Sequence, residues 1–118
     1  MEHIRTGDAG ESAAAEHLKA SGYAILALKY RARPGEVDIV ASQGGTFVFA
    51  EVKTRRGGAY GTPAEAVTRR KQEKLMATAL CYMKQHGLYD RPMRFDVIEV
   101  MMTGREARIN HIVNAFGR

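Results

Sequence analysis

The sequence predicts an α/β fold in which one small mixed β-sheet is flanked by helices, in the order α-β-β-β-α-β-β. Two segments carry apolar residues at helical spacing. Five shorter segments are rich in β-branched or aromatic residues, and turns containing glycine separate several of them. Packing the helices on a sheet is the simplest way to bury both kinds of apolar face. The 118 residues suit a single domain, residues 1–118.

The first helix is expected at residues 8–21. Asp8 and Glu11 have the spacing of a capping pair, and Gly22 suits the C-terminal stop. Residues 23–30 are apolar and partly aromatic, which predicts a strand followed by a turn at residues 31–35.

A hairpin is expected next, with strands at residues 36–41 and 46–54 around the turn SQGG. After the glycine-rich loop at residues 56–61, the sequence Thr62-Pro-Ala-Glu65 carries three helix-start signals together. The second helix should run from there to about His86, with Gly87 as its stop. Its buried stripe is expected to contain Leu75, Met76, Ala79, Leu80 and Met83. Residues 94–102 and 108–113 predict the last two strands.

Composition excludes several classes of protein. The chain is 45% apolar and 26% charged, which argues against wholesale disorder. No apolar run approaches the roughly 18 residues of a membrane span, and the N-terminus lacks the apolar core of a signal peptide. The single cysteine, Cys81, allows no internal disulfide. We therefore expect a cytoplasmic protein without a membrane partner.

The net charge of +5 comes from one segment. Residues 53–74 hold seven basic side chains and two acidic ones, so they carry the whole surplus. A localised basic surface indicates a polyanionic partner, nucleic acid above all. The alternative is a solvated helix face beside a basic loop.

Alternation along the hairpin brings acids together. If both valine-rich faces are buried on the same side, a turn at residues 43–46 places Asp38 opposite Glu51 and Glu36 opposite Lys53. Opposed carboxylates with Cβ atoms about 5 Å apart repel unless a cation compensates. Mg²⁺ accepts one or two carboxylates plus water and phosphate. Lys53 would then orient an attacking water or stabilise phosphate charge. The alternative is an ion-paired sheet, with Glu36 on Lys53 and Glu51 on Arg55.

Other candidates each have a structural alternative. Glu11 extends the apolar stripe of the first helix, so its carboxylate either points toward the sheet or completes the Asp8 cap. Gln72 precedes the buried stripe of the second helix, so it either reaches the site or caps the edge of the core. Asp96 and Glu99 lie on opposite faces of one strand and are expected to be structural.

The basic side chains are candidate phosphate contacts. Arg69, Arg70 and Lys71 would contact phosphates or form a solvated helix face. The loop RRGGAYG, which contains Arg55, Arg56 and Tyr60, would wrap a nucleic-acid backbone with the Tyr60 ring stacked on a base, or would be only a connection. The four histidines have no paired ligand spacing, so no structural zinc site is expected.

The order of these motifs resembles a known group of nucleases. GEVDIV followed by FVFAEVKTR resembles the core of the PD-(D/E)XK superfamily, the restriction-endonuclease-like fold. The whole chain is similar to the YraN family of small bacterial proteins, which is related to archaeal Holliday-junction resolvases. The likeness includes GDAGESAAAEHL, GYAILALKYRARPGEVDIV, YGTPAEAV, RFDVIEV and INHIVNAF. Val37 departs from the pattern, which has proline before the aspartate.

The resemblance implies a metal-dependent endonuclease that hydrolyses phosphodiester bonds of DNA, with branched or junction DNA as the candidate substrate. It makes Asp38 and Glu51 metal ligands and Lys53 the catalytic lysine, and Glu11 corresponds to the first-helix acid that completes the set for Mg²⁺ or Mn²⁺. The nucleic-acid contacts would come from Arg55, Arg56, Tyr60, Arg69, Arg70, Lys71 and Gln72. A homodimer is expected because symmetric cutting needs two sites. The alternatives are a non-catalytic nucleic-acid-binding module with this fold and a small protein-interaction partner.

Overall fold

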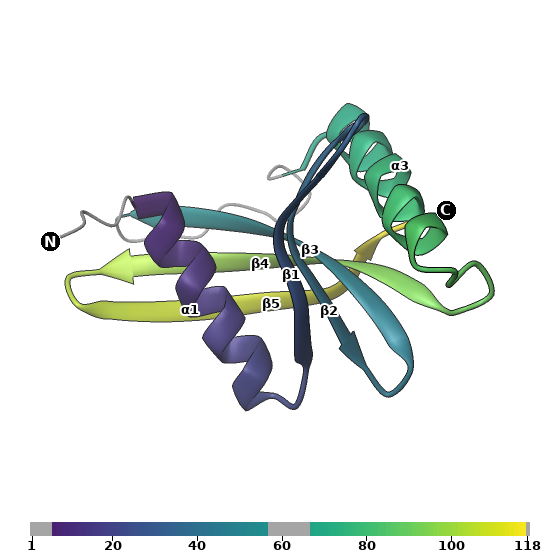
Figure 1. Cartoon of the computed structure of the whole chain (residues 1–118). Coiled ribbons are helices and arrows are strands. Elements are labelled where there is room, and N and C mark those ends of the chain that lie inside the picture. Colours follow the sequence, from purple (N-terminus) through teal and green to yellow (C-terminus); the bar gives the residue numbers. More distant parts are fainter. Residues whose placement is uncertain (1–5, 57–66, 118) are drawn as a thin grey trace, which may run out of the picture.

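The computed structural model describes residues 6–56 and 67–117, and it confirms the predicted order of elements. Figure 1 shows helices lying against one twisted sheet, which in the described residues has five strands. The elements are α1 (Thr6–Ala20), β1 (Ala24–Ala32), β2 (Gly35–Gln43), β3 (Thr46–Arg56), α3 (Arg69–Gln85), β4 (Met93–Thr103) and β5 (Glu106–Phe116).

The strands lie in sequence order, β1-β2-β3-β4-β5. All neighbours are antiparallel except β3 and β4, which are parallel. A parallel pair needs a long crossover, and the segment that contains α3 provides it. The sheet is therefore mixed, as the sequence predicts.

The two helices bury opposite faces of the sheet. On one face α1 packs Ala14, Ala15 and Leu18 against a core whose buried sheet residues are Ile39, Ala41, Val48, Ala50, Ile98 and Val100. On the other face α3 packs against a second core, made of Val37, Val40, Phe49, Val67, Leu75, Ala79, Tyr82, Met83, Phe95 and Val97. Both faces of β3 are consequently apolar along its first half, which explains the uninterrupted run FVFA.

The start of α3 differs from the prediction. Val67 and Thr68 are not helical, and the helix begins at Arg69 with Thr68 as its N-cap. Thr68 has an extended backbone, and its hydroxyl accepts a hydrogen bond from the Lys71 amide at 3.2 Å. A continuous helix from residue 62 to residue 86 is thus wrong, because a second threonine nearer the apolar stripe caps it. The predicted cap at residues 62–65 and the loop at residues 57–61 lie outside the described residues.

The predicted hairpin register is confirmed over half of its length. β2 and β3 pair from Gln43↔Thr46 to Ile39↔Ala50. The ladder ends there, one residue before Asp38 and Glu51. Beyond this point β2 pairs only with β1, and β3 pairs only with β4. Figure 1 shows the β1–β2 hairpin bending away from β3 toward α3, so the two strands form a fork.

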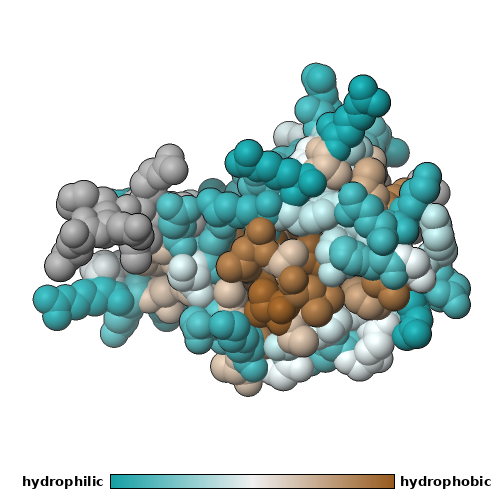
Figure 2. Space-filling model, in the orientation of Figure 1, coloured by the Kyte–Doolittle hydropathy of each residue, from teal (hydrophilic) through white to brown (hydrophobic). Residues whose placement is uncertain are grey.

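The outer surface is mainly hydrophilic. Figure 2 shows an apolar patch in the middle of the face seen there, surrounded by hydrophilic side chains. β1, an edge strand, carries two exposed large apolar side chains, Leu26 and Leu28. In the part of the chain that the structure describes, no helix is long and apolar enough to span a membrane.

Candidate active site

The fork between β2 and β3 is held by Asp38. Its Oδ2 atom accepts a hydrogen bond from the Val52 amide at 2.7 Å, so the side chain satisfies a β3 amide beyond the last β2–β3 pair. The carboxyl group thereby lies beside Glu51, the first β3 residue past the ladder. The predicted meeting of these acids occurs at the fork rather than across a paired ladder.

Glu51 is buried and faces two ammonium groups. Its Oε1 atom lies 2.7 Å from the Lys71 Nζ atom and 3.9 Å from the Lys53 Nζ atom. Only 7% of the Glu51 side chain is exposed. The acids border a cleft of about 230 Å³ whose lining residues are Gly35, Glu36, Asp38, Glu51, Lys71, Lys74 and Leu75. Three acids therefore border a small cleft together with Lys71 and Lys74 from α3, and Lys53 approaches Glu51 from β3 without lining the cleft.

Burial and crowding of charge shift the protonation of these groups. Desolvation and then the Glu51 charge raise the pKa of Asp38 from 3.8 to about 7, against the Val52 hydrogen bond that lowers it. Burial, followed by the adjacent Lys71 ammonium, lowers the pKa of Lys53. Burial is the largest single cause and would lower the pKa of Lys71, but the hydrogen bond to Glu51 and the charges of Glu51 and Asp38 together raise it. Opposed shifts of this kind are typical of catalytic sites.

Glu11 lies at the edge of this group rather than inside it. Its Oε1 atom is 3.7 Å from the Lys29 Nζ atom, which also binds Asp8 Oδ1 at 2.9 Å. Burial is the largest cause of the raised pKa of Glu11, and its charge adds to the shift of Asp38. Among the described residues no three His, Cys, Asp or Glu side chains are grouped for a metal. The central acids are thus the pair Asp38 and Glu51, with Glu11 as a neighbour.

A glycine allows α1 to approach the site closely. A Cβ atom added to Gly10 would collide with the Thr54 hydroxyl and lie 3.0 Å from the Thr54 Cβ atom. The first half of α1 therefore rests directly on β3, and this contact places Glu11 near the fork.

The ion pairs that the ion-paired-sheet alternative predicts, Glu36 with Lys53 and Glu51 with Arg55, do not form between these described residues. Glu36 pairs with Arg31 on the neighbouring strand, and not with Lys53. Arg55 donates to Glu99 Oε2 at 3.0 Å, and Glu99 Oε1 accepts from Asn110 at 3.0 Å. The Glu51 carboxylate is left to the lysines, because Arg55 is held by the fully buried Glu99.

The predicted nucleic-acid contacts are dispersed. Arg69 and Arg70 are exposed on the first turn of α3, and Arg69 lies 3.8 Å from Glu73. The Gln72 amide donates to the Val67 carbonyl at 3.0 Å, so this side chain closes the start of the helix. Arg56 is exposed at the end of β3, and Tyr60 lies outside the described residues.

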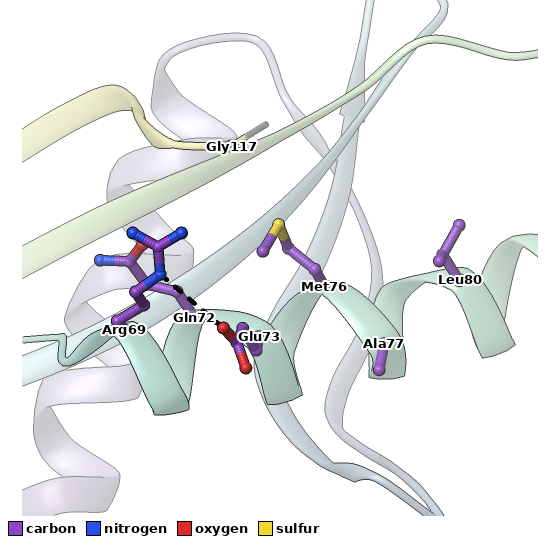
Figure 3. Close-up of a pocket in the computed structure, with 7 residues that line it drawn as sticks. All are labelled: Arg69, Gln72, Glu73, Met76, Ala77, Leu80 and Gly117. Carbon is purple, nitrogen blue, oxygen red and sulfur yellow. Dashed lines mark ion pairs between the residues drawn. The ribbon is translucent and has the colours of Figure 1, made fainter.

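A second hollow lies along α3, apart from the acid pair. It has a volume of about 410 Å³, and Figure 3 shows the side chains that line it, with Arg69 and Glu73 paired at one end and Leu80 at the other. Arg69 and Gln72 belong to this hollow, whereas Lys71 lines the cleft with the acids. The four basic and polar candidates of α3 thus divide between two surfaces.

Asp96 organises a separate buried network. It accepts hydrogen bonds from the Arg94 guanidinium and from the Asn114 amide, the latter at 2.9 Å. Its Oδ2 atom lies 2.7 Å from His111 Nε2. His111 in turn contacts His17 on α1 at 3.2 Å. This network ties β4, β5 and α1 together on the face away from α3, which fits the structural role expected for Asp96.

The sequence predicts Lys71 as a phosphate contact, and the structure adds its ion pair with Glu51, which the sequence does not predict. Lys71 precedes the buried Leu75 by four residues, so both lie on one side of α3. The spacing that places Gln72 beside the apolar stripe of the second helix also places Lys71 on the side of Leu75. What the sequence lacked was the position of the β2–β3 fork that receives it.

The family model and the relatives found by comparison with known proteins all point to the same family. A model of the uncharacterised protein family UPF0102 matches residues 10–100. A UPF0102 protein of Symbiobacterium thermophilum is 56% identical over 96 residues, 81% of each chain. Relatives from Trichlorobacter lovleyi and Alkaliphilus oremlandii are 49% and 46% identical, and the matches cover 93% and 95% of this chain and 88% and 97% of theirs. The matched range, residues 10–100, contains Glu11, Asp38, Glu51, Lys53 and Lys71.

Proposed function

The chain belongs to the uncharacterised protein family UPF0102, and from this premise we propose that it is a metal-dependent endonuclease that hydrolyses DNA. The observation that carries the proposal is the meeting of Asp38 and Glu51 at the β2–β3 fork, with Lys53 beside them. Buried carboxylates with a lysine in a cleft are costly for folding alone, and they suit chemistry on a phosphodiester.

The donor set fits a hard divalent cation. Two carboxylates supply oxygen ligands, and the cleft leaves space for water and a substrate phosphate, as Mg²⁺ or Mn²⁺ requires. The Lys71 ammonium already lies against the Glu51 carboxylate, which supports the proposal that this position can hold a cation. Asp38 and Glu51 would hold the metal, and Glu11 would support it from α1. When bound, the metal would lower the pKa of a water and polarise the phosphodiester.

Lys53 would act on the water or on the phosphate. Its ammonium is partly buried on the strand that carries Glu51, 3.9 Å from that carboxylate. Burial and the neighbouring Lys71 lower its pKa, which makes proton transfer at Nζ easier near neutral pH. A fixed positive charge at this place would also stabilise charge that develops on the phosphate oxygens.

DNA would approach over the basic surface beside the cleft. Arg70, Lys71 and Lys74 border a shallow depression of about 290 Å³ that adjoins the acid cleft through the two lysines. Cations at this edge suit the phosphates that flank a bond to be cut. Branched DNA is the substrate we propose first, which requires a homodimer with two sites acting in the cytoplasm.

Cleavage assays test this function directly. Labelled linear, flap and four-way-junction DNAs are incubated with the protein in Mg²⁺, Mn²⁺ or EDTA. We expect cutting only with metal, and a loss of at least about 100-fold in Asp38→Asn and in Lys53→Met. The control is Lys84→Met, which removes an exposed lysine at the far end of α3. No cutting of any substrate in either metal would refute the proposal.

A non-catalytic nucleic-acid-binding module is the second candidate. The observation that favours it is the ion pair between Lys71 and Glu51, which neutralises one acid without a metal. Under this alternative Asp38→Asn leaves DNA affinity unchanged. Removing Arg70 would weaken binding and reduce its dependence on salt.

A further inference from the structure

We infer that Lys71 is an internal competitor for the metal: its ammonium holds Glu51 when no divalent cation is present, and it must leave that oxygen for one to bind. The inference rests on the proposed function, because it concerns how the same site takes up its cation. It assigns Lys71 a role in addition to contact with a substrate phosphate.

The geometry separates Lys71 from the other lysines. Its Nζ atom is 2.7 Å from Glu51 Oε1, whereas the Lys53 Nζ atom is 3.9 Å from the same oxygen. Lys71 is therefore the closer partner of a carboxylate that is almost wholly buried. It comes from α3, across the cleft from the strand that carries the acid. Its contact with Glu51 joins the two walls of the cleft.

Lys71 is also able to leave. Its side chain is 42% exposed, against 7% for Glu51, so the ammonium can turn into solvent while the carboxylate stays in place. A lysine side chain is long and flexible and keeps its charge hydrated when it moves outward. The exchange needs no movement of α3 or of the sheet.

Ammonium and metal cannot share the oxygen. A divalent cation bound to Asp38 and Glu51 would lie within a few ångströms of the Lys71 Nζ atom and repel it strongly. The metal must therefore displace Lys71, and the free energy of the ion pair is subtracted from the metal affinity. Once displaced, Lys71 still borders the cleft beside Lys74, where it would contact a substrate phosphate.

Metal titration of the full chain without DNA tests the inference. Calorimetry with MnCl₂ measures the dissociation constant for wild type, Lys71→Met and Lys74→Met. Methionine keeps most of the apolar stem of lysine and removes its charge. Lys74→Met is the matched control, because it removes the same charge from the same cleft but has no contact with Glu51 in the described structure. We expect Lys71→Met to bind Mn²⁺ about tenfold more tightly than Lys74→Met does.

The outcomes are distinct. If wild type binds Mn²⁺ and Asp38→Asn weakens this binding, yet Lys71→Met binds no more tightly than Lys74→Met, the inference is wrong and the proposed metal site stands. If neither wild type nor Lys71→Met binds Mn²⁺, the metal site fails and the inference fails with it. Binding by Lys71→Met alone supports the inference most strongly.

Thermal melting with and without Mn²⁺ tests the inference even if Lys71→Met is less stable than wild type. Lys71→Met leaves Glu51 without its closer partner, so the metal-free variant should melt below wild type. Saturating Mn²⁺ should then raise the melting temperature of Lys71→Met more than that of wild type, because at the same concentration a ligand that binds more tightly stabilises the folded state more. An equal or smaller rise would contradict the competition.

Discussion

Asp38→Asn should stabilise this protein most at alkaline pH, and the gain should shrink to nothing as the pH falls to the ordinary Asp38 pKa of 3.8. The Asp38 carboxyl is desolvated at the fork and faces the Glu51 charge, which together raise its pKa to about 7. Asparagine has nearly the same shape as the protonated acid, and its carbonyl oxygen can still accept the Val52 hydrogen bond. The substitution thus removes a buried negative charge and keeps the contact that closes the fork.

The size of the effect follows from the pKa. In the unfolded chain Asp38 ionises near its ordinary value of 3.8, and in the folded chain near 7. Between these values the folded state holds a proton that the unfolded state has lost, so wild-type stability falls as pH rises. The gap is about three pH units, each worth about 1.4 kcal/mol, which gives a loss of up to about 4 kcal/mol by pH 8. Asp38→Asn should recover most of it.

Urea denaturation at pH 5 and at pH 8 without metal measures this difference. The exposed Asp90, changed to asparagine, is the control for loss of one carboxylate from the surface. We expect Asp38→Asn to exceed wild type in free energy of unfolding by roughly 1–2 kcal/mol at pH 5 and by roughly 4 kcal/mol at pH 8, so that the gap widens with pH. An Asp38→Asn variant that is equally stable, or less stable, at pH 8 would refute the desolvated acid pair.

Two further substitutions test the supports of the site. Gly10→Ala should lower the free energy of unfolding in urea by about 1–3 kcal/mol, because the new methyl group meets Thr54. This loss is expected although alanine normally favours a helix over glycine. A stabilised variant would contradict the close approach of α1. Asp96→Ala should lower the free energy of unfolding by about 3–5 kcal/mol, because the largely buried Arg94 loses its carboxylate and His111 loses its partner. A loss below about 1 kcal/mol would exclude Asp96 as the centre of that network.

Local patterns were enough to predict the elements and half of the hairpin. Alternation in β2 and β3 predicts the register that the structure has. It does not predict which residues share a face, because Val37 lies in the α3-side core and Ile39 in the α1-side core. The end of the ladder was not predictable from alternation, since the split depends on how α3 and the β1–β2 hairpin pack together. Because of that split, Asp38 bonds to the Val52 amide, and Glu36 finds Arg31 instead of Lys53.

The start of α3 shows the limit of local signals in another way. The start signals at residues 62–65 are stronger in sequence than a lone Thr68, yet Thr68 is the cap. The position of a helix start within an apolar pattern is set by what the helix packs against, and here Val67 is buried in the α3-side core. Starting at Thr68 is also what brings Lys71, on the first turn, to Glu51.

The fork makes the acid pair costly, and this cost is an argument about function. Asp38 needs only a hydrogen-bond acceptor to hold the Val52 amide, and asparagine would supply one without the charge. A chain selected for folding alone gains nothing from ionising Asp38 beside Glu51, whereas a cation-binding site requires both charges. The two measurements on Asp38→Asn therefore have to be taken together. Higher stability with loss of cleavage identifies a charge kept for catalysis, and higher stability without any change in nucleic-acid binding or cleavage would show that the charge has no use at this site.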